Sequence, residues 1–206
     1  MGWYERRVLP VLLDKMMTGE ETVRLRKDAL AQARGRVLEI GFGTGLNVPH
    51  YPPAVTHLVG VDPNSGMEKL ARQRLGGARM SGEFVLGRGD SRLPFDDSSF
   101  DTVVTTFVLC TVGDVGRALS EIWRVVKPEG QYLLLEHGLA PDAGVQRWQQ
   151  RLNRFNRLML GGCNLNRPIA KLVGNAGFTL HTSNEFFQSG APKFAGWTTS
   201  ATARRQ

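Results

Sequence analysis

The sequence is poor in cysteine and contains no long apolar run. Only two of its 206 residues are cysteine, Cys110 and Cys163, and neither has a CxxC or CxxH neighbour. Such spacing predicts neither a disulfide framework nor a zinc site and favours a reducing compartment. The first twenty residues include Glu5, Arg6 and Asp14. A signal peptide and a membrane-spanning helix are therefore not expected. The sequence instead predicts a cytoplasmic protein.

Sequence repeats are also absent, and the composition is that of one globular domain. Apolar residues make up 41% of the chain and charged residues 22%, which excludes disordered and fibrous classes. The net charge of +7 is unevenly spread, because residues 37–136 hold 12 acidic and 9 basic side chains and residues 137–206 hold 2 and 9. The acidic middle predicts a cationic or hydroxyl-rich ligand, whereas the basic ends fit an anionic partner or a solvated surface.

Short β-rich runs alternate with helical patterns along the chain. Helical spacing covers 65–75 and 114–126, and Lys127-Pro128-Glu129-Gly130 predicts a helix stop and a turn. This alternation predicts a mostly parallel, doubly wound α/β sheet. The expected strands are 36–40, 56–61, 83–86, 102–107 and 131–136, with helices over 1–33, 142–160 and 166–175 and closing strands at 178–187 and 193–203.

The first expected strand runs into the glycine turn GFGTG at 41–45. Glycine lets a backbone pass close beneath a ligand and adopt positive φ. A dinucleotide fingerprint needs a third glycine where this chain has Leu46. Glu39, two residues before the turn, would repel a pyrophosphate but suits an ammonium group. The turn therefore predicts a cationic ligand rather than a phosphate-bearing one.

Two further carboxylates follow the next two strands. Asp62 comes directly after the second strand, where it can accept hydrogen bonds from both ribose hydroxyls. Asp90 follows the third strand, where it can accept one from the exocyclic amine of adenine. Aspartate also ends strands as a turn or cap residue. Taken in order with Glu39, however, these residues describe a groove for an adenosine that carries an amino-acid tail.

Four ordered motifs within about residues 35–138 carry a family resemblance. VLEIGFGTG, GVDPNSGM (60–67), GDSRLPFDDSSFD (89–101) and RVVKPEGQYLLLEHG (124–138) resemble those of the class I S-adenosylmethionine-dependent methyltransferases. The resemblance implies a Rossmann-like seven-stranded sheet of order 3-2-1-4-5-7-6 with the seventh strand antiparallel, and S-adenosylhomocysteine as a product. It implies that the cofactor lies against Glu39, Gly41, Gly43, Gly45, Asn47, Asp62, Pro63, Asp90, Ser91 and Phe107.

Finer features are similar to one branch, the small methyltransferase-like thiol S-methyltransferases. They are HYPP (50–53), VLCTV (108–112), EH (136–137) and GCNLNR (162–167). The likeness implies an acceptor pocket formed by His50, Cys110, Thr111, Cys163 and Asn164. Membrane-associated animal members begin with a long apolar anchor, whereas residues 1–17 here are interrupted by charges. The chain is interpreted as one domain, with an N-terminal helical lid (1–34), a cofactor-binding core (35–138) and acceptor-side helices and closing strands (139–206).

Methyl transfer depends mainly on positioning, so it leaves few obligatory catalytic residues to find. An acceptor thiol with a pKa of about 8.5 needs a proton acceptor. His137 follows the buried fifth strand and is the first candidate, unless it only hydrogen-bonds backbone or Glu136. His50 is the second candidate, whereas His57 and His181 are expected to be structural. Cys110 is interpreted as a small apolar filler rather than a nucleophile.

The segment 147–159 places four arginines beside an apolar arc on one helix. Such a helix either rests on an anionic membrane surface or packs on the sheet with a solvated basic edge. Four functions therefore stay open. The first is methylation of a small lipophilic acceptor, with thiol sulfur ahead of oxygen or nitrogen, and the second is N-methylation of a phospholipid headgroup. Nucleic-acid methylation is disfavoured, because no Asn/Asp-Pro-Pro-Tyr follows the fourth strand, and cofactor binding without turnover is the last.

Overall fold

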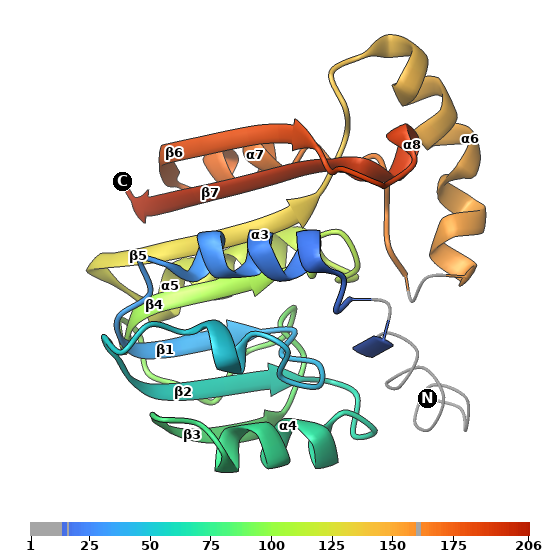
Figure 1. Ribbon diagram of the computed structural model, residues 1–206. Coiled ribbons are helices and arrows are strands. Elements are labelled where there is room, and N and C mark those ends of the chain that lie inside the picture. The colour runs from blue at the N-terminus through green and yellow to red at the C-terminus, as the bar shows by residue number, and fades with distance from the viewer. Residues whose placement is uncertain (1–13, 16, 160–161) are drawn as a thin grey trace.

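The computed structural model describes residues 14–15, 17–159 and 162–206 (Figure 1). Strands and helices alternate along its first two thirds, as the hydrophobic pattern predicts. In chain order the elements are α3 (Glu20–Leu30), β1 (Gly35–Ile40), η1 (Val48–His50), β2 (Val55–Asp62), α4 (Glu68–Gly76), β3 (Ser81–Leu86), β4 (Phe100–Thr106), α5 (Val115–Val125), β5 (Val126–His137), α6 (Ala143–Met159), α7 (Ile169–Asn175), β6 (Phe178–Phe187), α8 (Lys193–Gly196) and β7 (Trp197–Arg205).

The strands form a single sheet of order β3-β2-β1-β4-β5-β7-β6. The pairs within β3-β2-β1-β4-β5 are parallel, and β7 runs antiparallel to both of its neighbours. The strand order and the antiparallel seventh strand confirm the predicted Rossmann-like α/β fold. Figure 1 shows the arrowheads of β1, β2, β4 and β5 on the side of the sheet where α6 and α8 lie.

Each face of the sheet has its own hydrophobic core. Alternate residues of β1 face opposite sides, so Leu38 packs with α5 and α7 whereas Val37 packs with α3 and α4. Figure 1 shows α3 and α4 on the near face and α5 and α7 behind the sheet. Because helices cover both faces, the central strands are apolar on both sides. This explains why they read as continuous hydrophobic runs rather than alternating ones.

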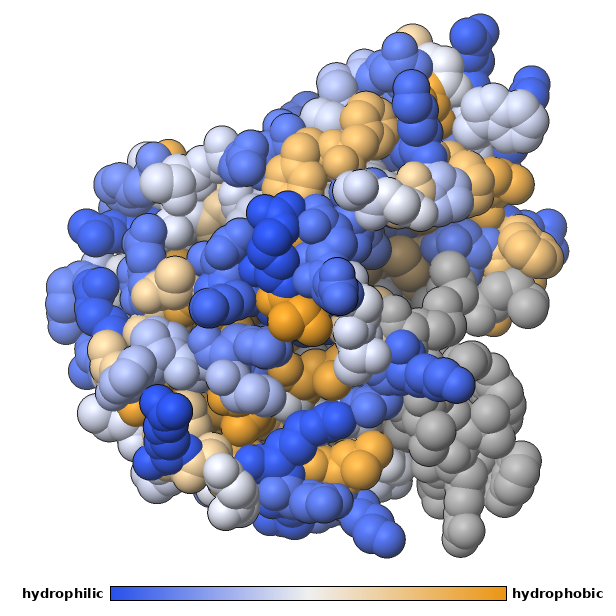
Figure 2. All heavy atoms as spheres, viewed as in Figure 1, coloured by the Kyte–Doolittle hydropathy of each residue, from blue (hydrophilic) through white to orange (hydrophobic). Residues whose placement is uncertain are grey.

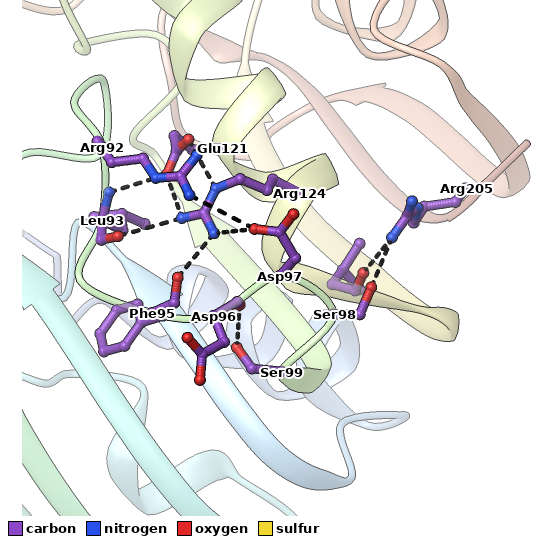
Figure 3. Close-up of polar contacts among 11 residues, drawn as sticks. Arg92, Leu93, Phe95, Asp96, Asp97, Ser98, Ser99, Glu121, Arg124 and Arg205 are labelled. Atoms are coloured by element: carbon purple, nitrogen blue, oxygen red, sulfur yellow. Dashed lines mark hydrogen bonds and ion pairs between the residues drawn. The ribbon is translucent and has the colours of Figure 1, made fainter.

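The loop that follows Asp90 is fastened to α5 by Arg124 (Figure 3). Its guanidinium donates to the Phe95 carbonyl at 2.8 Å and to the Asp97 carboxylate at 2.7 Å. It also donates to Glu121 at 2.7 Å, one turn earlier on the same helix. Hydrogen bonding to Glu121 raises the pKa of Arg124 further above its usual value. One side chain thus holds the segment between β3 and β4 in place.

Several element boundaries differ from the expectation, and three of these differences have a local explanation or change the element type. Residues 193–196 form α8 instead of the start of a strand, because Pro192 precedes them with a φ of −58° that suits a helix start. The sequence 127–130, predicted as a turn, belongs to β5, which begins directly after α5. The helix expected from residue 166 begins at Ile169, since Pro168 disfavours helical backbone at the residue before it.

The N-terminal prediction can be compared only in part. Two helices were expected over 1–33, and the second is α3; the first falls mostly on residues 1–13 and 16, which lie outside the described residues. Asp14 contacts α4 and the glycine turn, where it accepts hydrogen bonds from Arg74 Nη1 at 2.7 Å and from the Thr44 hydroxyl. Among the described residues, no helix combines the length and the apolar character needed to cross a bilayer.

Candidate active site

The candidate site lies at the carboxyl ends of the central parallel strands. Strand order reverses between β1 and β4, so the loops after these two strands leave toward opposite faces of the sheet. In open α/β sheets, ligands bind in the crevice that this reversal opens. The residues predicted from the sequence to bind the cofactor lie at the ends of β1 and β2 and in the loops that follow β1, β2, β3 and β4. The fold therefore brings all four loops to one edge of the sheet.

The glycine turn after β1 depends on backbone that only glycine adopts readily. Gly41, Gly43 and Gly45 have φ values of 70°, 56° and 83°, in the left-handed region. A Cβ on Gly41 would lie 2.1 Å from Val108 Cγ2, whereas one on Gly43 would meet no side chain within 4 Å. The turn is thus packed against the loop after β4 on one side and open at Gly43 on the other.

Asp62 links the end of β2 to the glycine turn. Its Oδ2 accepts a hydrogen bond from Gly43 N at 2.9 Å, and its Oδ1 accepts one from Asn64 N at 2.8 Å. Burial raises the pKa of the carboxyl group, and the two backbone donors oppose this shift. Each oxygen keeps a lone pair for a further donor. The adjacent Pro63, also predicted to touch the cofactor, is exposed.

A buried polar network surrounds Glu39. Its two oxygens accept from Asn47 Nδ2 at 2.8 Å and from the Tyr51 hydroxyl at 2.6 Å. Burial raises the pKa of Glu39 to about 7. Arg26, from α3, donates to Asn47 Oδ1 at 2.9 Å. The two predicted residues Glu39 and Asn47 are therefore joined by Tyr51 and Arg26, neither of which was predicted to bind the cofactor.

Arg26 leaves one donor of this network unused. Its side chain is buried, and its Nε is the one buried side-chain N or O atom among the described residues that has no hydrogen-bond partner. The guanidinium lies 5.4 Å from the ring centroid of Phe107, at the edge where the predicted cofactor residues meet. The sequence of α3 (EETVRLRKDAL) is polar and gave no sign that Arg26 is buried at this site, because arginine on a helix is usually solvent-exposed.

The third predicted carboxylate, Asp90, is held by a neighbouring arginine. Arg88 Nε and Nη2 each donate to it at 2.9 Å, and Asp114 N donates at 3.2 Å. Hydrogen bonding from Arg88 lowers the pKa of Asp90. The Arg88 side chain is 63% exposed, so a ligand can displace it at little cost. Ser91, the next predicted residue, is exposed.

The loop after β4 carries the predicted residue Phe107 in an unusual conformation. Phe107 has a φ of 59°, in a region that residues with a Cβ rarely adopt. Its ring lies 4.6 Å from that of His137. Glu136 holds this loop, since its carboxylate accepts from Val108 N at 3.0 Å and Cys110 N at 3.4 Å. Burial raises the pKa of Glu136 to about 7.

The predicted base and two predicted acceptor residues meet beyond this loop. Cys110, His137 and Cys163 place a sulfur or ring-nitrogen atom each within 4.8 Å of one another. Hydrogen bonding from the Cys110 thiol, and then from His137, lowers the pKa of Cys163, whereas the pKa of the buried Cys110 is raised. The two cysteines, which have no CxxC or CxxH neighbour in the sequence and therefore gave no sign of a shared site, are brought together by the fold. We name these three residues the thiol–imidazole cluster.

The remaining predicted acceptor residues differ in their placement. Asn164 adjoins the cluster and donates from N and Nδ2 to the Cys110 carbonyl, at 2.7 and 2.9 Å. The Thr111 hydroxyl bonds within its own loop, to the Val108 carbonyl at 2.9 Å. His50 ends η1, and burial, followed by the charge of Arg26, lowers its pKa.

Comparison with known proteins finds relatives that are methyltransferases. A family model described as a methyltransferase domain matches residues 38–134. The human thiol S-methyltransferase TMT1A is 35% identical over 147 residues, which are 69% of this chain and 59% of that protein. A phosphatidylethanolamine N-methyltransferase of Cereibacter sphaeroides is 33% identical over 141 residues, 68% of this chain and 69% of that protein. The chain thus spans about three fifths of the thiol S-methyltransferase's length.

The likeness extends to solved structures. The crystal structure of the YcgJ protein from Bacillus subtilis superposes with a TM-score of 0.68 at 19% identity. The match covers 91% of this chain and 100% of that one. At this identity the likeness concerns the fold, and it agrees with the strand order found here.

Proposed function

This chain belongs to the class I S-adenosylmethionine-dependent methyltransferases, and we infer that it methylates the sulfur of a small, lipophilic thiol. The observation that carries the choice of acceptor is the thiol–imidazole cluster at the carboxyl ends of β4 and β5, beside Phe107. A relative with 35% identity is named a thiol S-methyltransferase, which supports the same choice.

The residues predicted to bind the cofactor fit it in three respects. Glu39 and its network suit the ammonium group, and the unpartnered Nε of Arg26 suits the carboxylate beside it. Asp62 and Asp90 suit the ribose hydroxyls and the adenine amine. Gly43 leaves open space at the turn. When bound, S-adenosylmethionine supplies an electrophilic methyl group on a positively charged sulfur.

The chain's own residues then have to position the acceptor and take up its proton. Phe107 and the partly buried side chains of His137 and Cys163 would cover the reacting atoms and exclude water. A ring nitrogen of His137 would receive the proton of the acceptor thiol, so that the thiolate sulfur is free to attack the methyl carbon. Glu136 keeps the loop that carries Phe107 and Cys110 in register with the end of β5.

A panel of acceptors tests this proposal. Alkyl thiols, thiophenols, phenols and amines are incubated with labelled cofactor and the wild-type chain. We expect methyl thioethers as products, and His137→Gln should slow alkyl thiols about 100-fold or more. The loss should shrink for acidic thiophenols, which ionise unaided. His181→Gln, on the exposed surface of β6, is the control. Equal losses for both thiol classes, or methylation of phenols and amines alone, would refute thiol activation by His137.

A phospholipid headgroup is the second candidate acceptor, favoured by the outer face of α6. Trp148, Phe155 and Leu158 are 57%, 63% and 78% exposed, and exposed arginines lie between them. Figure 2 shows hydrophobic and hydrophilic residues side by side on the side of the molecule where α6 lies. A groove of about 660 Å³ runs between α6 and α8, lined by Trp148, Arg151 and Phe194 among others. One relative is named a phosphatidylethanolamine N-methyltransferase.

Vesicles separate peripheral membrane contact from phospholipid methylation. The chain is sedimented with anionic or neutral vesicles, and extracted lipids are assayed for labelled methyl groups. Contact through α6 predicts binding that weakens with salt and falls in Phe155→Ser. The matched control is Leu86→Ser, at a leucine on β3 whose exposure (57%) is close to that of Phe155. Labelled headgroups would favour the second candidate over the first, whereas binding without labelled lipid would leave the thiol as acceptor.

A further inference from the structure

The thiol–imidazole cluster has the composition and spacing of a metal site. Its residues come from three segments: Cys110 from the loop after β4, His137 from the end of β5 and Cys163 from the loop after α6. Two thiolates bound to one Zn²⁺ at tetrahedral geometry lie about 3.8 Å apart, given zinc–sulfur distances of about 2.3 Å. The observed limit of 4.8 Å between all ligand atoms is closed by side-chain shifts of about 1 Å.

Residues outside the cluster fix the backbone of both cysteines. The Cys110 carbonyl accepts two hydrogen bonds from Asn164, at 2.7 and 2.9 Å. The Cys163 carbonyl accepts one from Asn156 Nδ2, at 2.8 Å. The loops after β4 and α6 are thus joined through backbone groups, which leaves both sulfur atoms as ligands. A site whose ligands are held before the ion binds loses less entropy on binding.

The His137 ring is held by a side-chain amide. Its Nε2 lies 3.4 Å from Gln188 Oε1, and Gln188 Nε2 donates to the Thr22 hydroxyl at 3.2 Å. This orientation of the amide turns an acceptor toward the ring. A metal-binding histidine characteristically donates its second ring N–H to such an acceptor, which leaves the other nitrogen unprotonated for the ion. Gln188 therefore lies where it can fix the orientation and protonation of the His137 ring.

We propose that Cys110, His137 and Cys163 bind one Zn²⁺ ion and leave its fourth coordination position open toward the acceptor pocket. Two thiolates and one neutral imidazole offset the charge of the ion. Catalytic zinc sites use three protein ligands with one open position, and Cys₂His is among the known sets. Cys110 is buried while Cys163 and His137 are partly accessible, so the open position faces outward.

The role of the ion rests on the proposed function. An acceptor thiol would take the fourth position: its S–H bond breaks, a sulfur–zinc bond forms and the proton leaves to solvent water. The ion would then keep the acceptor sulfur ionised, with His137 as a ligand instead of the proton acceptor. Metal binding and thiol activation by His137 alone thus make different predictions for chelators, which abolish activity only in the first case.

Metal binding itself is tested without any turnover. Tag-free, reduced protein is loaded with Zn²⁺, dialysed and assayed by elemental analysis, and Co²⁺ is titrated into the apoprotein. We expect about one ion per chain and a thiolate-to-cobalt charge-transfer band. Cys110→Ser, Cys163→Ser and His137→Ala should each lose stoichiometric binding. Gln188→Ala should weaken it about 10- to 100-fold, and His181→Ala should leave it unchanged.

Two results would overturn the metal site. One is a reduced, folded wild-type chain that binds no ion above the level of its Cys163→Ser variant. The other is a Cys110–Cys163 disulfide that forms in the reduced protein despite the presence of excess Zn²⁺. Folding of each variant is checked by binding of S-adenosylhomocysteine, which uses residues outside the cluster. A variant that binds neither nucleoside nor metal is treated as unfolded, and Cys163→Ala takes its place in the comparison of metal binding with the wild type.

Binding of the acceptor thiol to the metal ion is tested with the visible spectrum of the Co²⁺-loaded chain. Adding an alkyl thiol should shift the visible bands of the Co²⁺-loaded chain, whereas the alcohol with the same carbon skeleton should not. A loaded chain whose spectrum ignores thiols would refute acceptor coordination while leaving the metal site in place. A chain that shifts with thiol but never methylates it would refute the proposed function instead.

Discussion

At the scale of single residues, the groove combines charges that burial disfavours. Glu39 is fully enclosed, and its pKa of about 7 reflects a carboxylate removed from water and only partly compensated by Tyr51, Arg26 and Asn47. Because Glu39 is buried, its protonated form suits this network better than its charged form does. The charged form is the one that suits an ammonium group. Stability and cofactor recognition therefore place opposite demands on this side chain.

The pH dependence of stability tests this conflict. Because the pKa of Glu39 is raised from 4.5 to about 7 in the folded chain, its stabilising contribution is present below about pH 4.5 and is lost as pH rises through 7. Relative to Glu39→Gln, the wild type should lose about 3 kcal/mol of unfolding free energy between pH 4.5 and 8. Urea unfolding of both proteins at several pH values measures this. A pH-independent difference would mean that Glu39 is charged throughout.

Arg26 gives the second prediction at this scale. If its unpartnered Nε meets the cofactor's carboxylate, Arg26→Lys should weaken S-adenosylhomocysteine binding about 10-fold. Binding of 5′-methylthioadenosine, which lacks the amino-acid tail, should change little. The matched control is Arg24→Lys, two residues earlier on α3 and exposed. Calorimetry with both nucleosides decides the matter, and equal losses for the two would assign Arg26 a purely structural role.

At the scale of elements, the sequence located the strands because their apolar runs are continuous and end in turn residues. Predicted site residues at strand ends, such as Asp62 at the end of β2 and His137 at the end of β5, could be placed for the same reason. The meeting of Cys163 with Cys110 could not be predicted, because it depends on the path of the loop after α6 and its bonds through Asn164. Pro192 at the start of α8 is a similar case, since proline suits helix starts and extended chain alike.

The loop between β3 and β4 yields a prediction about stability. Arg124 is 11% exposed and Glu121 is 13% exposed, at 2.7 Å from each other. Arg124→Met would remove the counter-charge of this carboxylate, which would keep only the Leu93 N–H as a donor, and would leave the Phe95 and Leu93 carbonyls without their Arg124 donors. We therefore expect a loss of about 3 kcal/mol. The control Arg117→Met removes an exposed arginine of the same helix, paired with Asp114, and should cost under about 0.5 kcal/mol. Thermal and urea unfolding compare the two, and similar losses would show that Arg124 does not anchor the loop.

At the scale of the whole molecule, the proposed roles divide along the chain as charge does. The acidic middle carries the three proposed cofactor carboxylates, Glu39, Asp62 and Asp90, whereas the basic last third forms α6 and the strands at the far edge of the sheet. The thiol–imidazole cluster lies where the two parts meet, because Cys110 comes from the loop after β4, His137 from the end of β5 and Cys163 from the loop after α6. Acceptor chemistry can therefore diverge among relatives while the groove stays the same.

Calorimetric titration of S-adenosylhomocysteine and of NAD into the wild type and Asp62→Ala tests the groove most directly. We predict saturable binding of the sulfur nucleoside, no binding of NAD, and a loss of about 10-fold or more in Asp62→Ala, because buried ribose hydroxyls would lose their acceptor. Unchanged affinity in the folded variant, or preference for NAD, would contradict the assignment of this carboxylate edge to the cofactor.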